Sequence, residues 1–381
     1  MAKEKINLGI LFPDDNIWTG GKNYFLSLIT SLKYLKNNEL NYVVIASPVL
    51  KKLFLKNKIN LKNIYFTNFF KRNHILNFIR KIFLFLFRED IILNFIIKLK
   101  KINIFSHYKP NNKIRSVCWI PDLQHKYLKQ NFTLKEIKRR DFLFRNYLDY
   151  ADKIIVSSFD SKKKLISNYK NIKKNKIEIL RFVPKVNLRK LERLNYKKYK
   201  LNHKYLYVPN QFWRHKNHEI LIKCAKELKK KNYYIQFVLS GNRSINTNYF
   251  SDLSSQINKF DLHHYFNYVG MVPSSDVSRL IFGSQALINP SFFEGWNTGV
   301  EEAKILKKKI ILSDIDVHKE QASINSVFFE KKNPKQLAKV IMNLKDTENK
   351  NLIIIKNNYQ KSRKEFAKQY LNILKKINLL Y

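Results

Sequence analysis

The strongest chemical signal in the sequence is a pair of glutamates on either side of a glycine-containing turn. Glu294 and Glu302 lie in Ala286–Gln321, ALINPSFFEGWNTGVEEAKILKKKIILSDIDVHKEQ, where an apolar strand enters a turn and a helix begins near Thr298. A helix N-terminus offers free N–H groups and a positive dipole, so this turn is suited to bind a diphosphate. Both carboxylates can then face one ligand. The alternative is that they are ordinary helix acids on a solvated surface.

A second segment can bring positive charge to the same ligand. Tyr207–Leu228, YVPNQFWRHKNHEILIKCAKEL, reads as a strand followed by a helix, with Arg214 and Lys216 just after the strand. Arginine binds phosphate as a bidentate fork and lysine binds it as a point charge, so either residue can neutralise a diphosphate. In a chain this basic, a solvated surface charge is the alternative for each of them.

The first half of the chain holds two further candidates. Gly20 and Gly21 follow the first expected strand in WTGGKNYFLSLI, where a backbone without side chains can approach a ligand closely, although glycine pairs also mark ordinary turns. They are not part of a Walker A loop, because the other residues of that motif are missing. Asp122 and His125 follow a later strand in CWIPDLQHKYL. A lone histidine at such a place is either structural or functional.

The elements that must position these residues alternate between strands and helices, which predicts βαβ units and an α/β fold of two Rossmann-like domains. The expected strands are 6–12, 42–46, 102–106, 116–120, 153–157 and 177–182 in the first half, and 205–208, 234–240, 265–269, 286–289, 310–313 and 327–330 in the second. We expect an N-terminal domain at 1–187 and a C-terminal domain at 204–357, joined by a charged connection. The helix at about 358–381 is expected to pack back on the first domain.

Composition limits the classes of partner. The formal net charge is +44, which suggests nucleic acid or an anionic membrane, but Lys, Asn and Ile abound throughout, as AT-rich codons would produce. Without a basic arm or a known module, we expect no nucleic-acid partner. Cys118 and Cys224 are far apart, so neither a disulfide framework nor a metal site is expected. With no signal peptide and no spanning segment recognised, we expect a cytoplasmic protein.

The segment PSFFEGWNTGVEEA resembles the Glu-x7-Glu motif of family 4 of the retaining glycosyltransferases, also called glycosyl transferases group 1. These enzymes have the GT-B fold, two Rossmann-like domains facing a central cleft. The resemblance implies that Glu294 contacts the donor sugar near its reacting end and that Glu302 holds the ribose hydroxyls. It also places the turn residues against the sugar and phosphates: Gly295, Trp296, Asn297, Thr298 and Gly299. Segments that resemble this family occur along nearly the whole chain, except in residues 50–112.

The same resemblance assigns the donor diphosphate to Lys216 in HKNH. Many relatives have an arginine five residues before this lysine, where this chain has Gln211, so Arg214 is the candidate replacement. In the N-terminal domain, Gly20 and Gly21 look like the loop that faces the donor phosphates or the acceptor.

PDLQH resembles a loop that carries a histidine near the donor sugar. The implied role of His125 is a hydrogen bond to a sugar hydroxyl or to the acceptor, which would make it catalytic. Asp122 either orients this histidine or binds the acceptor.

These resemblances imply transfer of a hexose or deoxyhexose from a nucleoside-diphosphate sugar, with retention, without metal or cofactor. The expected acceptor is a glycan or a lipid-linked precursor of a surface polysaccharide. We expect Glu294 to position the donor rather than to attack it, with the departing phosphate accepting the acceptor proton. The alternatives are a sugar-nucleotide 2-epimerase with the same fold and, as a different class, a basic nucleic-acid-binding protein.

One apolar and basic stretch, Ile75–Lys101, suggests a membrane surface. On a helix, Ile75, Ile79, Ile82, Phe83 and Leu86 form one stripe, and Arg80, Lys81 and Arg88 add positive charge. Such a helix can lie on an anionic leaflet, which would place the protein at the inner face of the membrane. The alternative is a buried helix pair, because Leu84 and Phe85 make the pattern apolar on more than one side.

Overall fold

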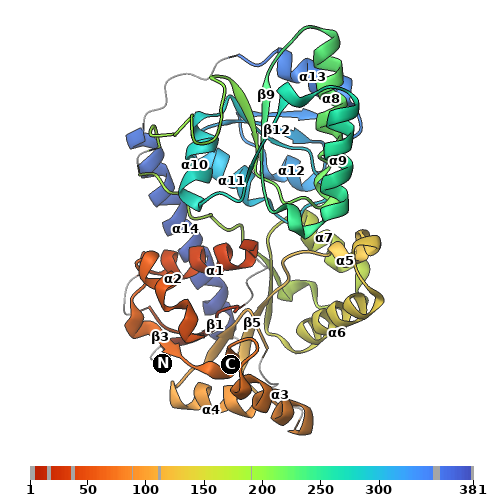
Figure 1. Cartoon of the computed structure of the whole chain (residues 1–381). Coiled ribbons are helices and arrows are strands. Elements are labelled where there is room, and N and C mark those ends of the chain that lie inside the picture. Colours follow the sequence, from red (N-terminus) through yellow and green to blue (C-terminus); the bar gives the residue numbers. More distant parts are fainter. Residues whose placement is uncertain are drawn as a thin grey trace. The chain divides into compact units, whose positions relative to one another are not determined.

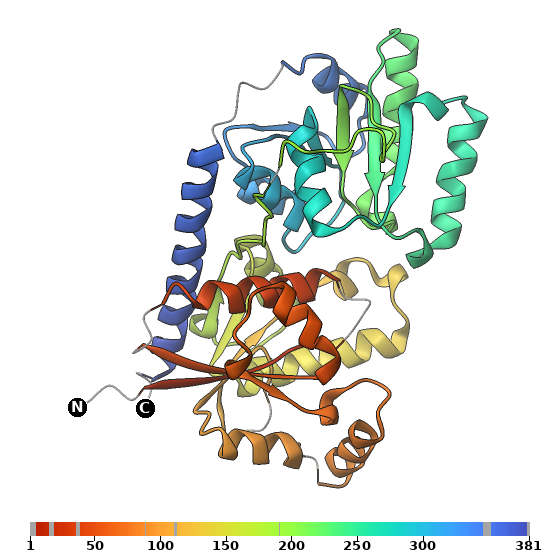
Figure 2. The same cartoon turned by 60° about the vertical axis from the view of Figure 1, so that its left-hand side comes forward.

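The computed structural model describes residues 5–14, 19–35, 39–87, 89–109, 113–189, 191–345 and 352–378. The chain divides into two compact units, the first comprising residues 1–184 and 360–381 and the second residues 185–359. Figures 1 and 2 show that each unit contains a sheet with helices packed on it. Trp18 and Arg88, which appear in the sequence motifs above, lie outside the described residues.

The first unit is built on a seven-stranded parallel sheet with strand order β3-β2-β1-β4-β5-β6-β7. Its strands are β1 (Ile6–Leu11), β2 (Leu40–Ala46), β3 (Ile64–Phe66), β4 (Ile104–Ser106), β5 (Arg115–Trp119), β6 (Lys153–Val156) and β7 (Ile177–Ile179). Its helices are α1 (Thr19–Leu32), α2 (Lys51–Lys56), α3 (Ile75–Phe87), α4 (Ile91–Leu99), α5 (Gln124–Tyr127), α6 (Leu134–Tyr150) and α7 (Phe159–Asn168).

The long C-terminal helix α14 (Leu352–Asn378) contributes residues 360–378 to the first unit. Arg363 is buried and donates from Nε to Ser31 Oγ at 3.1 Å and from Nη2 to Ser27 O at 3.2 Å, both on α1. Further along α14, the Tyr370 hydroxyl is hydrogen-bonded to Ser106 Oγ at the end of β4. Polar contacts therefore hold this helix to α1 and to the end of β4.

The second unit has a six-stranded parallel sheet with strand order β10-β9-β8-β11-β12-β13. Its strands are β8 (Tyr205–Val208), β9 (Gln236–Ser240), β10 (Phe266–Gly270), β11 (Ala286–Asn289), β12 (Lys309–Ser313) and β13 (Ser326–Phe329). Its helices are α8 (Glu219–Lys230), α9 (Thr247–Lys259), α10 (Ser274–Gly283), α11 (Thr298–Ile305), α12 (Asp316–Gln321) and α13 (Pro334–Met342). One core cluster links β8, α8, β9, β11 and α13.

Both sheets confirm the predicted α/β class of two Rossmann-like domains. In each sheet the first strand in sequence lies beside the fourth. The strand order runs outward in opposite directions from these two strands, so a topological switch point lies between them. In the second unit this switch point falls between β8 and β11. Open parallel sheets bind ligands outside the carboxyl ends of their strands at such points, because the flanking loops separate there.

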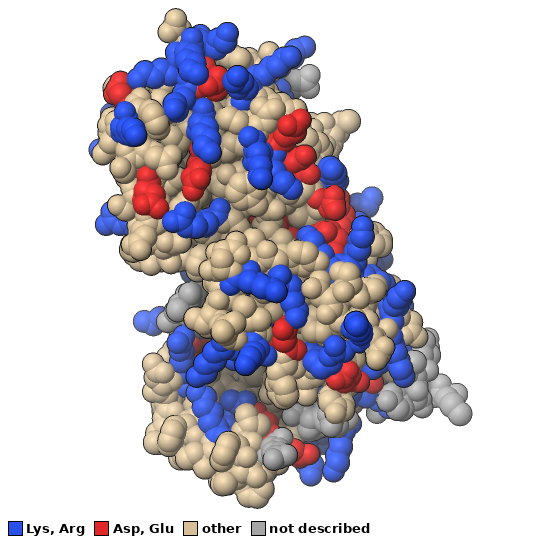
Figure 3. Space-filling model, turned by 90° about the vertical axis from the view of Figure 1, so that its right-hand side faces the viewer, with Lys and Arg blue, Asp and Glu red and all other residues tan. Residues whose placement is uncertain are grey.

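The surface is basic on the face drawn in Figure 3, where Lys and Arg are spread over the view and do not form a single stripe. Among the helices of the described residues, none has both the length and the apolar character needed to cross a bilayer.

Candidate functional site

A polar network lies at the carboxyl ends of β8, β11 and β12, three neighbouring strands of the second sheet. Strands β8 and β11 are buried along their whole length, and β12 is buried from Ile310 onward. Polar residues stand at or just after the end of each strand. Asn289 is the last residue of β11, Ser313 is the last residue of β12, and Asn210 follows β8 by two residues. Parallel strands bring these ends to one edge, so residues far apart in sequence meet at the switch point.

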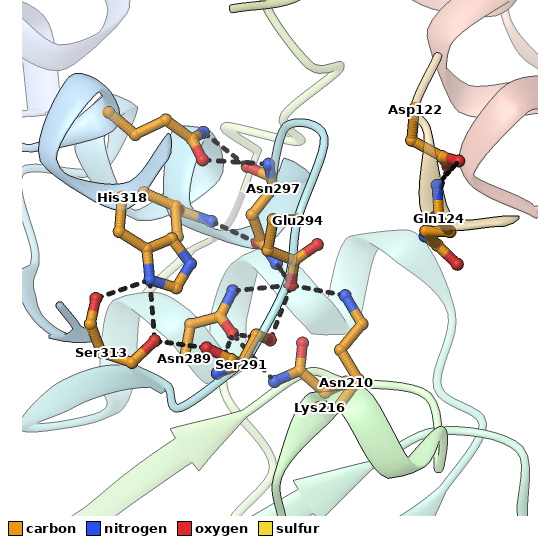
Figure 4. A network of polar contacts seen from close by, with 12 residues as sticks. Asp122, Gln124, Asn210, Lys216, Asn289, Ser291, Glu294, Asn297, Ser313 and His318 are labelled. Carbon is orange, nitrogen blue, oxygen red and sulfur yellow. Dashed lines mark hydrogen bonds and ion pairs between the residues drawn. The ribbon is translucent and has the colours of Figure 1, made fainter. Parts of the chain in front are cut away.

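Glu294 is the centre of this network, and its residue is only 5% exposed. Its Oε1 accepts a hydrogen bond from Lys216 Nζ at 2.6 Å and from Asn297 Nδ2 at 3.0 Å. Ser291 Oγ lies 2.7 Å from the same oxygen and Asn289 Nδ2 lies 3.5 Å from it. In Figure 4 the other carboxylate oxygen points away from these donors. Within the described part of the chain, no donor contacts it.

The charge state of Glu294 follows from its surroundings. Burial would raise the pKa of this carboxyl, but the nearby Lys216 charge and its hydrogen bond outweigh burial and lower the pKa to about 2. At neutral pH the side chain is therefore an anion held in one orientation. It presents one oxygen to any ligand at the strand ends.

A second layer from β12 and α12 fixes the loop that carries Glu294. Ser313 Oγ donates to Ser291 O at 2.6 Å, and His318 Nδ1 lies 2.9 Å from Ser313 O. Gln321 Oε1 accepts from Asn297 N at 3.0 Å, and its Nε2 donates to Asn297 O at 3.1 Å. Ser313, His318 and Gln321 are fully buried. The loop is thus held at both of its ends by side chains that the sequence analysis did not single out.

The loop ends at the N-terminus of α11, which is a suitable place for an anion. Asn297 caps this helix by accepting from Val300 N at 3.0 Å through Oδ1. The N–H groups of Thr298 and Gly299 have no partner in the described chain, so they are available to a ligand. A Cβ at Gly299 would lie 3.1 Å from Pro209 Cγ, so the helix starts close against the end of β8.

Glu302 lies on α11 and differs sharply from Glu294. Its side chain is partly buried and has no ion-pair or hydrogen-bond partner among the residues that the structure describes. Burial raises the pKa of this carboxyl to about 8. Burial and, more weakly, the Glu302 charge also raise the pKa of Tyr207 in β8, whose hydroxyl is bonded to Ser240 Oγ at 2.7 Å. Glu302 is therefore an acceptor to which the described residues supply no donor.

Among the residues whose positions are described, Lys216 is the one cation that contacts Glu294, although two histidines lie beside it in sequence. His215 and His218 are both buried, and burial, aided by the Lys216 charge, lowers the pKa of His215 to about 4 and that of His218 to about 3. Both imidazoles are therefore neutral at physiological pH. The left-handed Asn217 (φ +55°) turns the chain between them, and its side chain donates to Pro290 O at 3.0 Å.

The structure brings Lys216 to Glu294 but does not bring Arg214 there. Arg214 is exposed, and its Nη2 contacts Asp252 Oδ2 at 3.1 Å on α9. Gln211, at the position where the resemblance expects arginine, accepts from Asn242 N at 2.7 Å through Oε1. The diphosphate role of Arg214 stays a prediction, and it requires the arginine to leave its surface pair.

The N-terminal candidates lie in the first unit. Gly20 and Gly21 form part of the first turn of α1, whereas a loop before the helix was expected. A Cβ at Gly20 would meet no atom within 4 Å, so close packing within the described chain does not require this glycine. Asp122 follows β5 and accepts from Gln124 N at 3.1 Å, as Figure 4 shows. It also lies 3.6 Å from Arg140 Nη1.

His125 is fully buried, and its orienting partner is not the one expected. Its Nε2 lies 2.9 Å from Asp141 Oδ1 on α6 and 3.4 Å from the Tyr169 hydroxyl. The suggestion that Asp122 orients this histidine was wrong, because Asp141 does so. Burial lowers the pKa of His125 and outweighs the Asp141 contact, which favours the neutral ring. A contact with sugar stays a prediction, and the ring has no exposed surface in this structure.

A second buried histidine in the first unit was missed. His107 follows β4 at the switch point of that sheet, in the left-handed region (φ +68°). Its Nε2 lies 2.8 Å from the Tyr24 hydroxyl of α1, and Nδ1 is bonded to Ser106 Oγ. Burial lowers the pKa of His107 to about 3. It lies within 50–112, where no motif was recognised.

No group of three or more His, Cys, Asp or Glu side chains able to hold a metal ion exists among the residues with described positions. An Asp-x-Asp pair, Asp314 and Asp316, does follow β12 and was overlooked in the sequence. Asp314 Oδ1 accepts from Lys331 N at 3.1 Å, and Asp316 is exposed in the first turn of α12.

Two parallel Rossmann-like sheets of this strand order define the GT-B fold, and solved structures of that fold superpose on the whole chain. A glycosyltransferase from Rickettsia africae is 17% identical, with 99% of this chain and 98% of that one covered and a TM-score of 0.62. Anabaena HepE, solved with UDP and glucose, is 12% identical, with 98% of each chain covered and a TM-score of 0.64.

Sucrose-phosphate synthase from Thermosynechococcus elongatus is similar over the same extent, with 11% identity, 99% of this chain and 97% of that one covered and a TM-score of 0.62. At the sequence level, residues 192–361 match the family model of glycosyl transferases group 1. No curated protein matches the sequence. The matched residues contain the Glu294 network and Glu302.

Proposed function

We propose that this protein is a glycosyltransferase that binds a nucleoside-diphosphate sugar at the carboxyl ends of β8, β11 and β12. The observation that carries the proposal is the Glu294 carboxylate, fixed through Oε1 by Lys216 and Asn297 and presenting its other oxygen beside the N-terminus of α11. The match of residues 192–361 to glycosyl transferases group 1 supports it, as does the fold shared with a protein solved with UDP and glucose.

Lys216 and α11 form the diphosphate part of the proposed site. A lysine ammonium has three N–H donors, and Lys216 uses one on Glu294, so two can bind phosphate oxygens. The N–H groups of Thr298 and Gly299 add uncharged donors with the helix dipole behind them. Charge builds on the leaving diphosphate in the transition state, so donors held in place beforehand lower the barrier. Retention and independence from metal remain part of the proposal through the family resemblance.

Glu302 forms the nucleoside part of the proposed site. Its carboxyl has no partner among the described residues, and its pKa is about 8. The pKa is this high because the buried carboxylate accepts no hydrogen bond from donors that would stabilise its charge. Two vicinal ribose hydroxyls would supply those donors, and they would favour the carboxylate over the acid. Nucleoside binding should therefore lower the pKa of Glu302 and strengthen as pH rises toward 8 and above.

Glu294 positions the donor sugar in this proposal. Its Oε1 is committed to protein donors, so Oε2 is the oxygen that can accept from a sugar hydroxyl or face an oxocarbenium ion. The transferred group is a hexose or deoxyhexose, and the acceptor is a glycan or a lipid-linked precursor of a surface polysaccharide. The reaction would take place on the cytoplasmic side of the membrane, where sugar nucleotides are made.

The test begins with ligand binding by the full chain. The melting temperature is measured with UDP, GDP and their common sugars, because a ligand that binds the native state raises it. A transfer assay with the donor so identified follows, and product analysis separates a transferred sugar from an isomerised donor, which a 2-epimerase would give. The proposal fails if no nucleoside diphosphate stabilises the wild type. It also fails if Glu294→Gln and Glu302→Gln retain full activity at every donor concentration.

A further inference from the structure

Helix α3 in the first unit turns large apolar side chains toward the solvent, whereas a normal surface helix turns them toward the core. Large apolar side chains point outward from α3 and from α4 beside it, with 43% to 84% of each residue exposed: Phe78, Ile82, Phe85, Leu86, Phe95 and Leu99. Soluble proteins rarely expose contiguous apolar surface of this kind without a partner for it. The stripe predicted from Ile75 to Leu86 is thus outside the core, and the buried helix pair considered as its alternative does not describe α3.

The inner side of α3 explains why its apolar residues face outward. Arg80 Nε donates to Asp90 Oδ1 at 3.1 Å and to Oδ2 at 2.8 Å, and the guanidinium lies 4.3 Å from the centre of the Phe70 ring. Asp90 is buried and caps α4 by accepting from Leu93 N at 3.1 Å. The helix is therefore attached through a charged pair, whereas α4 buries Leu93, Ile96 and Ile97 in the core.

Positive charge surrounds the apolar face. The exposed cations of the same segment are Arg72, Lys81, Lys98, Lys100 and Lys101. Lys81 lies one helical turn from Phe85, and Lys98 lies next to Leu99. The only acids between 71 and 101 are Glu89 and Asp90, and Asp90 is already paired with Arg80. At the bottom of the view in Figure 3, the surface is largely tan with Lys and Arg beside it.

We propose that the outer face of α3 and α4 inserts into the interfacial region of an anionic lipid bilayer. A short helix with a large apolar face and flanking lysines lies in the plane of a membrane, with its apolar side chains 5–10 Å deep and its cations at the lipid phosphates, according to the general physics of such helices. With 13 and 9 residues, α3 and α4 are far shorter than a spanning helix.

A bilayer fits this face better than a second copy of the chain does. A symmetric dimer would bring two equal sets of lysines together, because each patch contacts its own copy, and a chain of net charge +44 would repel itself there. Anionic lipid supplies the opposite charge together with an apolar interior. The inference does not depend on the reaction proposed above, since it concerns another surface.

Vesicle flotation of the full-length protein tests the proposal. We expect the wild type to float with vesicles of phosphatidylcholine and phosphatidylglycerol, and to float much less with phosphatidylcholine alone or in high salt. F78S/F85S should lower the partition coefficient at least tenfold, whereas V49S/I324S, which removes two exposed apolar residues elsewhere, should not. K81A/K98A should lower it about fivefold for each lysine, and K364A/K368A on α14 should change it little.

A second measurement keeps the test decisive if F78S/F85S does not fold. Cys118 and Cys224 are buried, so an environment-sensitive dye on F85C reports from the proposed face. We expect its emission to shift to the blue with anionic vesicles. The proposal is overturned if the wild type binds no vesicles, if the control variants lose as much binding as the test variants, or if sedimentation without lipid reveals a dimer that F78S abolishes.

Discussion

Lys216 Nζ lies 2.6 Å from Glu294 Oε1, and this ion pair joins the loop after β8 to the loop after β11 across the switch point of the second sheet. Both side chains are largely buried, so water screens their attraction weakly. Removing one partner leaves an uncompensated charge, which is the costly way to break a buried pair. The pair therefore affects both the local stability of these two loops and the binding of a ligand at this edge of the sheet.

Lys216→Met is expected to weaken binding of a nucleoside diphosphate far more than binding of the nucleoside. A charge-assisted hydrogen bond contributes about 1.5–3 kcal/mol, so the diphosphate should bind roughly ten- to a hundredfold more weakly. Calorimetric titration with both ligands measures the difference. Lys229→Met, which breaks an exposed pair with Asp261, is the matched control and should leave both affinities unchanged. Equal losses for diphosphate and nucleoside would remove Lys216 from the phosphate site.

Glu294 should make stability depend on pH in the acid range. The pKa of Glu294 is about 2 in the folded protein against an ordinary value of 4.5, so the unfolded chain binds more protons between these values. The resulting stabilisation is complete above pH 4.5 and is lost as pH falls toward 2, with a size of about 3 kcal/mol. Urea unfolding of wild type and Glu294→Gln at pH 3 to 7 checks this. The difference between them should shrink on acidification, and a constant difference would contradict it.

Glu302 should make the protein less stable as pH rises above 4.5, which is opposite to the effect of Glu294. Its pKa of about 8 means that the folded protein holds a proton that the unfolded chain has released between pH 4.5 and 8. Stability therefore falls as pH rises through this window. Glu302→Gln should equal the wild type near pH 4.5 and exceed it by up to a few kcal/mol at pH 8 and above. Thermal unfolding across this range is the measurement. A Glu302→Gln variant less stable than wild type at pH 8 would show that the carboxylate has a partner.

Gln321 should act as a positioning residue for the Glu294 loop. Gln321→Leu removes the two hydrogen bonds that hold Asn297, so the start of α11 should become less well ordered. If the proposed reaction is correct, kcat should fall more than KM rises, because the loop positions groups that matter most in the transition state. Gln369→Leu, at an exposed position of α14, is the control. Unchanged kcat with raised KM would assign Gln321 to ground-state binding instead.

The alternation of apolar runs and helical patterns predicted the α/β class and located most strands. Strands β8 and β11 begin and end at the predicted residues, because each is a short, fully buried run. Strand β3 was not predicted, since Ile64–Phe66 is too short to give a pattern. Gly20 and Gly21 were expected before α1, although both lie within it. Glycine is a poor residue in a helix interior but is accepted in a first turn.

Sequence patterns could not predict which side chains contact one another. The residues that hold the Glu294 loop, such as Ser313 and Gln321, lie one strand away, and only the order of strands in the sheet reveals that they meet it. The partly buried contact between His125 and Asp141 depends on how α6 packs on α5, which no spacing shows. The outward face of α3 was equally hidden, because a helix that is apolar on several sides does not tell which side meets the core.

The spread of Lys and Arg over the face in Figure 3 has a kinetic consequence. A ligand that carries two or three negative charges experiences the summed field of the chain before it touches any residue, and this attraction speeds its encounter with the protein. Added salt should therefore slow association of a nucleoside diphosphate steeply. In the proposed site the departure of this ligand depends on contacts inside the network around Lys216, so the dissociation rate should change much less. Stopped-flow mixing at several salt concentrations would separate the two rates.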